Sequence, residues 1–235
     1  MSFDDPALVD FFAGNRNRPE HLYPSEARFL PELSAGSESV LDVGCAAGGF
    51  VEIWRAYNSR IRYVGVDVSA ALVDAARRLH PAETFVVGDA ATGIDLQDGV
   101  AEVVSALGWL HWEPRYAAAL PELWRLAARQ LFFDVRLHTG ADEIVGTQTI
   151  PGGRTPYICV PWGGLAQLMT ELRPGSIRGY GYLGAPADTV TGMPAELCFA
   201  TFVLGRGGSP LELDLDLPFA WPDQPASTTN GGTTA

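Results

Sequence analysis

The sequence predicts an α/β fold with a doubly wound, mostly parallel sheet and helices on both faces, and three observations support it. Strand-like and helix-like segments alternate between residues 39 and 137. The strand-like segments are short and almost wholly apolar, as expected for strands covered on both faces. An aspartate stands at the end of each of the first three strands. Right-handed crossovers between such strands give a doubly wound sheet.

Each element of this fold rests on a local pattern. Phe50, Ile53, Trp54 and Tyr57 recur at helical spacing and share one face, and Ser69 is suited to cap the next helix. A short loop joins the last two strands, which favours an antiparallel pair and hence a seven-stranded sheet with an antiparallel edge strand. Strands are predicted at 39–43, 61–68, 84–89, 99–107, 130–137, 176–183 and 196–206, and helices at 48–58, 69–80, 115–129 and 163–172.

Three regions follow from these patterns. Residues 1–37 are expected to form an N-terminal helical lid, with helices over 6–13 and 26–33, the second weakened by Pro31. Residues 38–206 form the main domain, and its insertion at about 139–175 forms a wall of the substrate pocket. Residues 207–235 are rich in Pro, Gly, Ser, Thr and acidic residues, so we expect a disordered tail.

The composition excludes several classes of function. Acidic residues outnumber basic ones 28 to 16, for a net charge of −12, which argues against a nucleic-acid partner. All the basic residues are Arg, so chemistry that depends on Lys, such as a Schiff base or a P-loop, is excluded. The substrate is therefore expected to be a small molecule.

The same sequence indicates a cytoplasmic protein. No apolar run approaches the roughly 18 residues that a membrane span needs, and the N-terminus is acidic where a signal peptide would be basic. Cys45, Cys159 and Cys198 are too widely spaced for a disulfide framework or a metal site, so we expect no metal and no membrane partner. The chain is expected to act as a monomer or a homodimer.

The stretch "VLDVGCAAGGF", Val40 to Phe50, predicts a ligand site. Its small residues let a ligand approach the backbone closely. Asp42, Asp67 and Asp89 end successive strands, and the carboxyl ends of parallel strands meet at the ligand-binding edge of a doubly wound sheet. One acid there would be explained by a turn or a helix cap. Three in succession favour a cofactor site.

Two cofactors fit a glycine-rich turn followed by an acid about 20 residues later. A nicotinamide cofactor is disfavoured, because the glycines read G-x-A-x-G and because Asp42 would repel a pyrophosphate. A cofactor with a ribose and no phosphate fits better. S-adenosylmethionine has ribose hydroxyls that need acceptors and a cationic sulfonium that tolerates nearby acids.

Four segments together resemble the class I S-adenosylmethionine-dependent methyltransferases of the small-molecule type. They are "VLDVGCAAGG", "YVGVDVS", "FVVGDA" and "ALGWLHW", in that order and spacing, over roughly residues 38 to 137. The resemblance implies a Rossmann-like fold and S-adenosyl-L-methionine as cofactor. It also implies that Asp67 accepts from both ribose hydroxyls, and that Asp89 and the backbone of Ala90 contact the adenine.

The turn would then pass close to the methionine part of the cofactor, with Asp42 behind it. One departure is Ala46, which stands where the family has its middle glycine and is tolerated if its φ stays negative. The cofactor-binding residues that the resemblance implies are Asp42, Gly44, Cys45, Ala46, Gly48, Asp67, Val68, Asp89, Ala90 and Ala106.

The acceptor side is predicted from residues beyond the fourth and fifth strands. His111 is the candidate base for a hydroxyl acceptor and His138 the second candidate, although each can equally be an ordinary loop histidine. Arg136 could hold a carboxylate or phosphate, or form a structural salt bridge. The substrate residues are expected to be Arg18, Tyr23, Trp109, Arg136 and Tyr157.

These observations predict an S-adenosylmethionine-dependent methyltransferase that methylates a hydroxyl of a small molecule. The segments "NRNRPEHLYPSE" and "LRPGSIRGYGYLGAP" further resemble bacterial methyltransferases of carbohydrate-related pathways. The alternatives are N-methylation of a small amine, and a catalytically inactive partner subunit that binds the cofactor.

Overall fold

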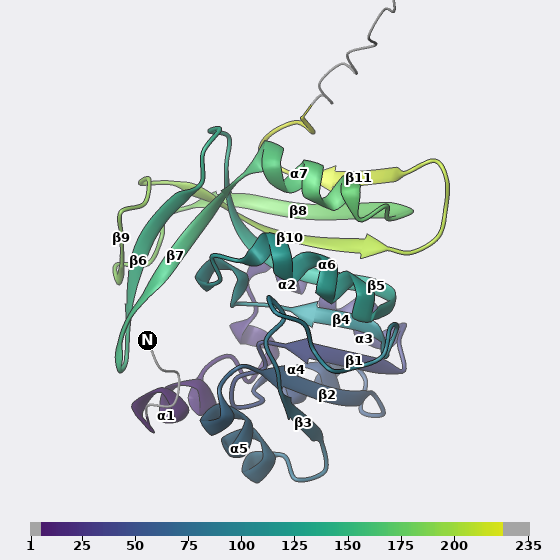
Figure 1. Ribbon diagram of the computed structural model, residues 1–235, viewed down its shortest axis with the longest axis vertical. Coiled ribbons are helices and arrows are strands. Elements are labelled where there is room, and N and C mark those ends of the chain that lie inside the picture. Colours follow the sequence, from purple (N-terminus) through teal and green to yellow (C-terminus); the bar gives the residue numbers. More distant parts are fainter. Residues whose placement is uncertain (1–5, 223–235) are drawn as a thin grey trace, which may run out of the picture.

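A long twisted sheet forms the centre of the computed structural model, which describes residues 6–222 (Figure 1). Five parallel strands make up its first half, and their order places β1 between β2 and β4. Strand order therefore reverses at β1, and ligand sites of doubly wound sheets lie at such a point, beyond the carboxyl ends of the strands. The five strands are β1 (Ser39–Val43), β2 (Arg62–Asp67), β3 (Thr84–Val87), β4 (Ala101–Ala106) and β5 (Ala127–His138).

The second half of the sheet contains the predicted antiparallel pair. Strand β10 (Leu197–Gly205) runs antiparallel to both β5 and β8 (Ser176–Gly184). The full order is β11-β8-β10-β5-β4-β1-β2-β3. The antiparallel strand thus lies inside the sheet rather than at its edge. The sheet is also longer than the seven predicted strands, because β11 (Glu212–Asp216) adds to β8 in parallel.

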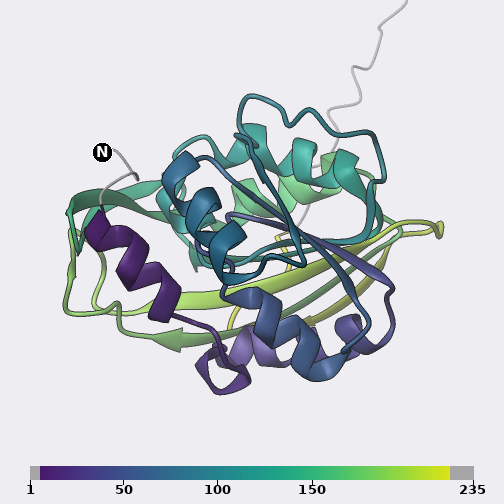
Figure 2. The same cartoon turned by 90° about the horizontal axis from the view of Figure 1, so that it is seen from below.

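Helices cover both faces of the sheet and bury two apolar cores (Figure 2). On one face, α3 (Leu30–Ala35), α4 (Phe50–Tyr57) and α5 (Ala70–Leu79) bury residues such as Trp54. On the other face, α6 (Tyr116–Leu126) and α7 (Trp162–Glu171) bury residues such as Leu120. The doubly wound α/β prediction is confirmed.

The N-terminal region is helical, as predicted, but its second helix is divided. It contains α1 (Pro6–Gly14), the 3-10 turn η1 (Pro19–His21), α2 (Pro24–Ala27) and then α3. Pro31 explains the division, because a proline ring clashes with the carbonyl four residues earlier, here that of Ala27. The helix therefore ends at Ala27, and Pro31 lies in the first turn of α3.

The insertion after β5 forms an antiparallel branch of the sheet. β6 (Ile144–Ile150) pairs with β7 (Gly153–Pro161) and with the short β9 (Val190–Thr191), and β7 joins the branch to β5. The branch extends beyond the main sheet toward α1 (Figure 1). The 3-10 turn η2 (Leu110–Trp112) follows β4.

The prediction of a disordered tail is wrong for residues 207–222. Beyond β11, the indole of Trp162 donates a hydrogen bond to the carbonyl of Ala220 at 2.7 Å. The rings of Phe219 and Trp221 lie 5.7 and 5.3 Å from the Trp162 ring. Residues 223–235, the rest of the predicted tail, lie outside the described residues. Within the described chain, no helix is long and apolar enough to span a membrane.

Candidate active site

The small-residue loop after β1 is attached to β2 by two backbone hydrogen bonds. The N–H groups of Gly44 and Cys45 both donate to the carbonyl of Val66, at 2.8 and 3.0 Å. Gly44 has a φ of +78°, and a Cβ on it would collide with the indole of Trp109. Glycine is required here for both reasons. Gly48, also at positive φ, packs against His80 on the far side of the loop.

Ala46 adopts a left-handed conformation, with a φ of +47°, so the expectation of a negative φ is wrong. For an L-residue this conformation costs roughly 1–2 kcal/mol. The turn keeps it because the Ala46 N–H donates to Oδ2 of Asp67 at 2.9 Å. The departure from glycine at this position is therefore accommodated with some strain.

Asp67 is oriented by backbone donors. Its other oxygen, Oδ1, accepts from the N–H of Ser69 at 2.9 Å, and the side chain is buried, which raises the pKa of its carboxyl. A carboxylate has about four acceptor positions, and the backbone donors of Ala46, Val68 and Ser69 leave capacity for a hydroxyl donor. Both the position and the free capacity fit the implied ribose contact.

Asp42 lies beneath the loop rather than in an open cavity. It is 2% exposed, and its Oδ2 accepts a hydrogen bond of 2.5 Å from the hydroxyl of Tyr63. Burial raises the pKa of Asp42 to about 7, although the hydrogen bond from Tyr63 opposes the shift. The buried site therefore favours the protonated form of Asp42 more than water does.

Two cavities adjoin the loop. We call the first, of about 320 Å³, the loop cavity, and the second, of about 180 Å³, the aromatic cavity. Six residues of the implied cofactor set line the loop cavity: Gly44, Ala46, Asp67, Val68, Asp89 and Ala90. The two cavities share the lining residues Phe12, Gly44, Ala46, Gly108 and Trp112. A ligand in one cavity therefore lies beside a ligand in the other.

Asp89 has a cationic neighbour that the sequence analysis did not identify. Its Oδ1 accepts from the N–H of Ala91 at 2.9 Å, and its Oδ2 lies 3.1 Å from Nη1 of Arg115. Arg115 also pairs with Glu113, and both residues line the loop cavity. An adenine amino group would have to share Asp89 with this guanidinium.

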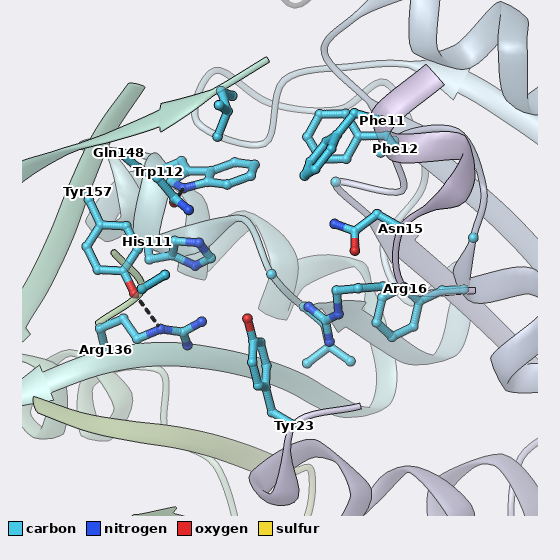
Figure 3. Close-up of a pocket in the computed structure, with 18 of the residues that line it drawn as sticks. Phe11, Phe12, Asn15, Arg16, Tyr23, His111, Trp112, Arg136, Gln148 and Tyr157 are labelled. Carbon is cyan, nitrogen blue, oxygen red and sulfur yellow. Dashed lines mark hydrogen bonds between the residues drawn. The ribbon is translucent and has the colours of Figure 1, made fainter. Parts of the chain in front are cut away.

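In the aromatic cavity, the guanidinium of Arg136 lies beside the hydroxyl of Tyr157 (Figure 3) and pairs with the buried Asp134. Its Nη1 donates to Oδ2 of Asp134 at 2.6 Å, and its Nε donates to the hydroxyl of Tyr157 at 3.0 Å. The guanidinium carbon lies 4.6 Å from the centre of the Phe199 ring and 5.3 Å from that of Tyr23. The side chain is 2% exposed, so its charge depends on Asp134 for neutralisation.

A second arginine, Arg16, lines the same cavity from the loop after α1. It forms an ion pair with the buried Glu26 and lies 4.8 and 4.9 Å from the ring centres of Tyr23 and Phe50. Its Nε is buried and has no hydrogen-bond partner within residues 6–222. A Cβ on Gly108 would approach its Nη1, so the guanidinium reaches the end of β4.

His111 also lines the aromatic cavity and is 6% exposed. Its ring lies 5.1 Å from that of Tyr157 and 5.0 Å from that of Trp112. Its Nδ1 is buried without a partner among the described residues. Burial, together with the positive charge of Arg136, lowers the pKa of His111 well below the ordinary histidine value. The imidazole is therefore neutral at physiological pH.

Trp112 joins three segments around the two cavities. Its indole donates to Oε1 of Gln148 on β6 at 2.8 Å, and its ring makes an edge-to-face contact with Phe12 of α1 at 6.0 Å. The N-terminal helix, η2 and the antiparallel branch thus meet at one side chain. The sequence analysis assigned no role to the side chains of Phe12, Trp112 and Gln148, because each belongs to a different segment.

The predicted acceptor residues divide into three groups. Tyr23, Arg136 and Tyr157 line the aromatic cavity with His111, whereas Trp109 lines the loop cavity instead. Arg18 is exposed and lines neither cavity. The structure brings Arg16, from the same segment, to the cavity in its place.

The remaining predicted residues lie around the two cavities. His138 lines neither, and its Nδ1 accepts from the N–H of Gly140 at 3.0 Å. Cys45 is buried and lines the aromatic cavity, while Ala106 is fully buried at the end of β4. Of the implied cofactor set, Asp42, Gly48 and Ala106 therefore support the loop from behind.

Similarity to known sequences agrees with this arrangement. A family model described as a methyltransferase domain matches residues 41–130. The trans-aconitate 2-methyltransferase of Paracidovorax citrulli (strain AAC00-1) is 32% identical over 124 residues, covering 53% of this chain and 46% of the relative. That of Variovorax paradoxus (strain S110) is 27% identical over 184 residues, covering 78% and 68%. The chain spans about half the length of the first two curated relatives it matches.

Solved structures share the fold at low identity. The N-terminal domain of EvdMO1, crystallised in the presence of SAH and D-fucose, has a TM-score of 0.60 at 12% identity, with 85% of this chain and 94% of that chain covered. The PH0226 protein from Pyrococcus horikoshii OT3 has a TM-score of 0.53 at 16% identity, with 78% and 88% covered. The matched domain and the sheet order support the class I S-adenosylmethionine-dependent methyltransferase that the sequence resembles.

Proposed function

We propose that this protein transfers a methyl group from S-adenosylmethionine to an oxygen atom of a small-molecule acceptor. One observation carries the proposal: the loop cavity, lined by Asp67 and Asp89, shares five lining residues with a second cavity. A cofactor in the first cavity can therefore present a group to a substrate in the second. The cofactor itself supplies the activated methyl group and the leaving group.

The chain's own residues fit each part of this cofactor. Asp67 retains acceptor capacity for the ribose hydroxyls, and Asp89 and Ala90 line the place expected for the adenine. Arg16 is suited to the methionine carboxylate, because its guanidinium reaches the end of β4 and its Nε has no partner within the described chain. The positive φ of Gly44 and Ala46 leaves the loop backbone open to close approach.

The acceptor side favours a small ligand. The aromatic cavity, at about 180 Å³, is smaller than the roughly 300–1,000 Å³ typical of pockets for drug-sized ligands. The net charge of −12 disfavours nucleic acid as acceptor. Methylation of a hydroxyl, the carbohydrate link, cytoplasmic localisation and the monomeric or homodimeric state stay predictions from the sequence. The same is true of His111 as a base, which only an acceptor that must lose a proton requires.

Calorimetry tests the cofactor assignment directly. We expect S-adenosylmethionine and its demethylated product to bind, and NAD not to bind. Asp74→Ala is a matched control for Asp67→Ala, because Asp74 is an exposed acid on α5 that pairs with Arg77. Binding of NAD in preference to S-adenosylmethionine would refute the proposal. Cofactor binding without turnover of any acceptor would favour the non-catalytic partner subunit.

A further inference from the structure

The charged side chains that line the aromatic cavity are positive, although the chain as a whole is strongly acidic. Two arginines, Arg16 and Arg136, line it, and no acidic residue does so among the described residues. Their partners, Glu26 and Asp134, are buried behind the cavity wall. Arg16 is assigned to the carboxylate of the cofactor, so Arg136 is the cation that this cavity offers to the acceptor, in a chain with a net charge of −12. An ammonium group would be repelled there, and an anion would be attracted.

The guanidinium of Arg136 is already ordered by its neighbours and keeps a donor for an anion. Asp134 is itself fixed by the N–H of Gly108, which donates to its Oδ1 at 2.5 Å, and the guanidinium is then held by Asp134 and Tyr157. These contacts use Nη1 and Nε, and Nη2 has no hydrogen bond within residues 6–222. The N–H groups of Nη2 are therefore the donors that remain for an anion such as a carboxylate. Because the side chain is already ordered, little conformational entropy is lost on binding.

The rest of the lining cannot readily remove a proton from the acceptor. His111 is the only imidazole among the described residues that line the cavity, and burial keeps it neutral but weakly basic. Efficient general-base catalysis needs a pKa near the working pH. An alcohol needs such a base, whereas a carboxylic acid with a pKa of about 4 is ionised at neutral pH. The neutral His111 can still donate a hydrogen bond from a ring nitrogen.

We propose that the acceptor is a small carboxylic acid, bound as its carboxylate by Arg136, and that the product is its methyl ester. The inference rests on the proposed function and adds the acceptor class to it. The aromatic rings of Tyr23, Trp112 and Phe199 line the cavity around Arg136 and suit an acceptor with a planar, unsaturated or aromatic body.

The reaction balances without a proton. A lone pair of the carboxylate oxygen forms the new O–C bond to the methyl group. The C–S bond breaks, and its electron pair stays on sulfur, which becomes a neutral thioether. One negative and one positive charge disappear together, so no proton is released. An alcohol or an ammonium acceptor would release one proton for each methyl group transferred.

Ligand binding gives the first test and does not depend on turnover. Benzoate, cinnamate and itaconate are each titrated beside the corresponding amide into the protein saturated with S-adenosylhomocysteine. We expect at least one carboxylate to bind about tenfold or more tightly than its amide, because only the carboxylate pairs with Arg136. If no carboxylate has an advantage over its amide, including the case in which neither binds, the inference is overturned.

Matched variants assign the preference to Arg136. Arg136→Lys keeps a positive charge beside Asp134 but loses the Nη2 donors, so the carboxylate preference should fall about tenfold while cofactor affinity changes less than threefold. Arg18→Lys, an identical change at an exposed site outside both cavities, should change neither. An unaltered preference in Arg136→Lys would refute the role of this residue.

Proton release gives the second test. Carboxylates and the matching alcohols and amines are incubated with S-adenosylmethionine in weak buffer, and S-adenosylhomocysteine is measured with an indicator dye. We expect turnover of a carboxylate with no proton released and a product that base hydrolysis returns to the acid. Turnover confined to an alcohol or amine, with one proton released, would overturn the inference while supporting the proposed methyltransferase. Failure to bind S-adenosylmethionine would refute the proposed function itself.

Discussion

Asp42→Asn should change how the stability of this protein depends on pH. The Asp42 carboxyl is buried under the cofactor loop, and burial raises its pKa from 3.8 to about 7. The folded protein therefore holds this proton more tightly than the unfolded chain does. The stability linked to Asp42 is full below about pH 4, falls as the pH rises toward 7, and levels off above that value. Asparagine is neutral throughout and shows no such loss.

The magnitude follows from the two pKa values. A difference of about 3 units, at 1.36 kcal/mol for each unit, corresponds to a loss of about 4 kcal/mol across the whole range. The isoelectric point of about 4.6 makes the acidic end unsuitable for measurement. Between about pH 5.5 and 7 the free energy of unfolding of Asp42→Asn, relative to wild type, should rise by about 2 kcal/mol.

Urea unfolding followed by tryptophan fluorescence, without cofactor, measures this difference at about pH 5.5, 7 and 8.5. A difference that stays constant within about 0.5 kcal/mol across this range would refute the assignment of a raised pKa to Asp42. Tyr63→Phe provides a control, because it removes the hydroxyl that donates to the carboxylate at 2.5 Å. The pKa of Asp42 should then rise further, and the decline in stability should extend to higher pH.

Four further predictions follow from the site and the tail. Asp67→Ala should weaken S-adenosylmethionine binding by about 1.5–3 kcal/mol in calorimetry, since the hydroxyls lose a charged acceptor; equal affinities would refute the ribose contact. His111→Gln should lower kcat less than about tenfold, whereas a loss of 10²–10⁴ would identify a general base. Ala46→Gly should raise the free energy of unfolding by about 1 kcal/mol by relieving the positive φ, and Ala47→Gly should not. Truncation after Arg206 should lower the Tm by about 4–8 °C, because β11 and the rings of Phe219 and Trp221, which pack on Trp162 of α7, together contribute at least ~2 kcal/mol. An unchanged Tm would show that the packing of the tail on the domain is weak.

The five parallel strands could be predicted from the sequence because their signals are local. Each strand is a short apolar run, each helix has its own periodicity, and each of Asp42, Asp67 and Asp89 lies at or just after a strand end. Parallel connectivity then brings the three acids to one edge of the sheet with no further information. Six residues of the predicted cofactor set line the loop cavity, whereas Arg115 and Glu113 were not predicted.

The tail shows why composition alone was insufficient. Its Pro, Gly and acidic content is typical of disorder. Leu211, Leu215 and Leu217 nevertheless lie an even number of residues apart and pack against the core. The alternation is a strand signal that composition averages away. The docking of Trp221 depends on Trp162, which lies far away in the sequence.

The sequence by itself determined the fold class, the positions of the five parallel strands and the sheet edge at which the three aspartates meet, because these follow from periodicity and from residues near strand ends. Only the tertiary structure decided the aromatic cavity. It selected Arg16 over Arg18, placed His138 outside both cavities, and positioned the acid partners of Arg16 and Arg136 behind the cavity wall. The physical reason is that the charge a ligand meets depends on which groups are already paired, and that pairing is set by packing between segments that share no local pattern.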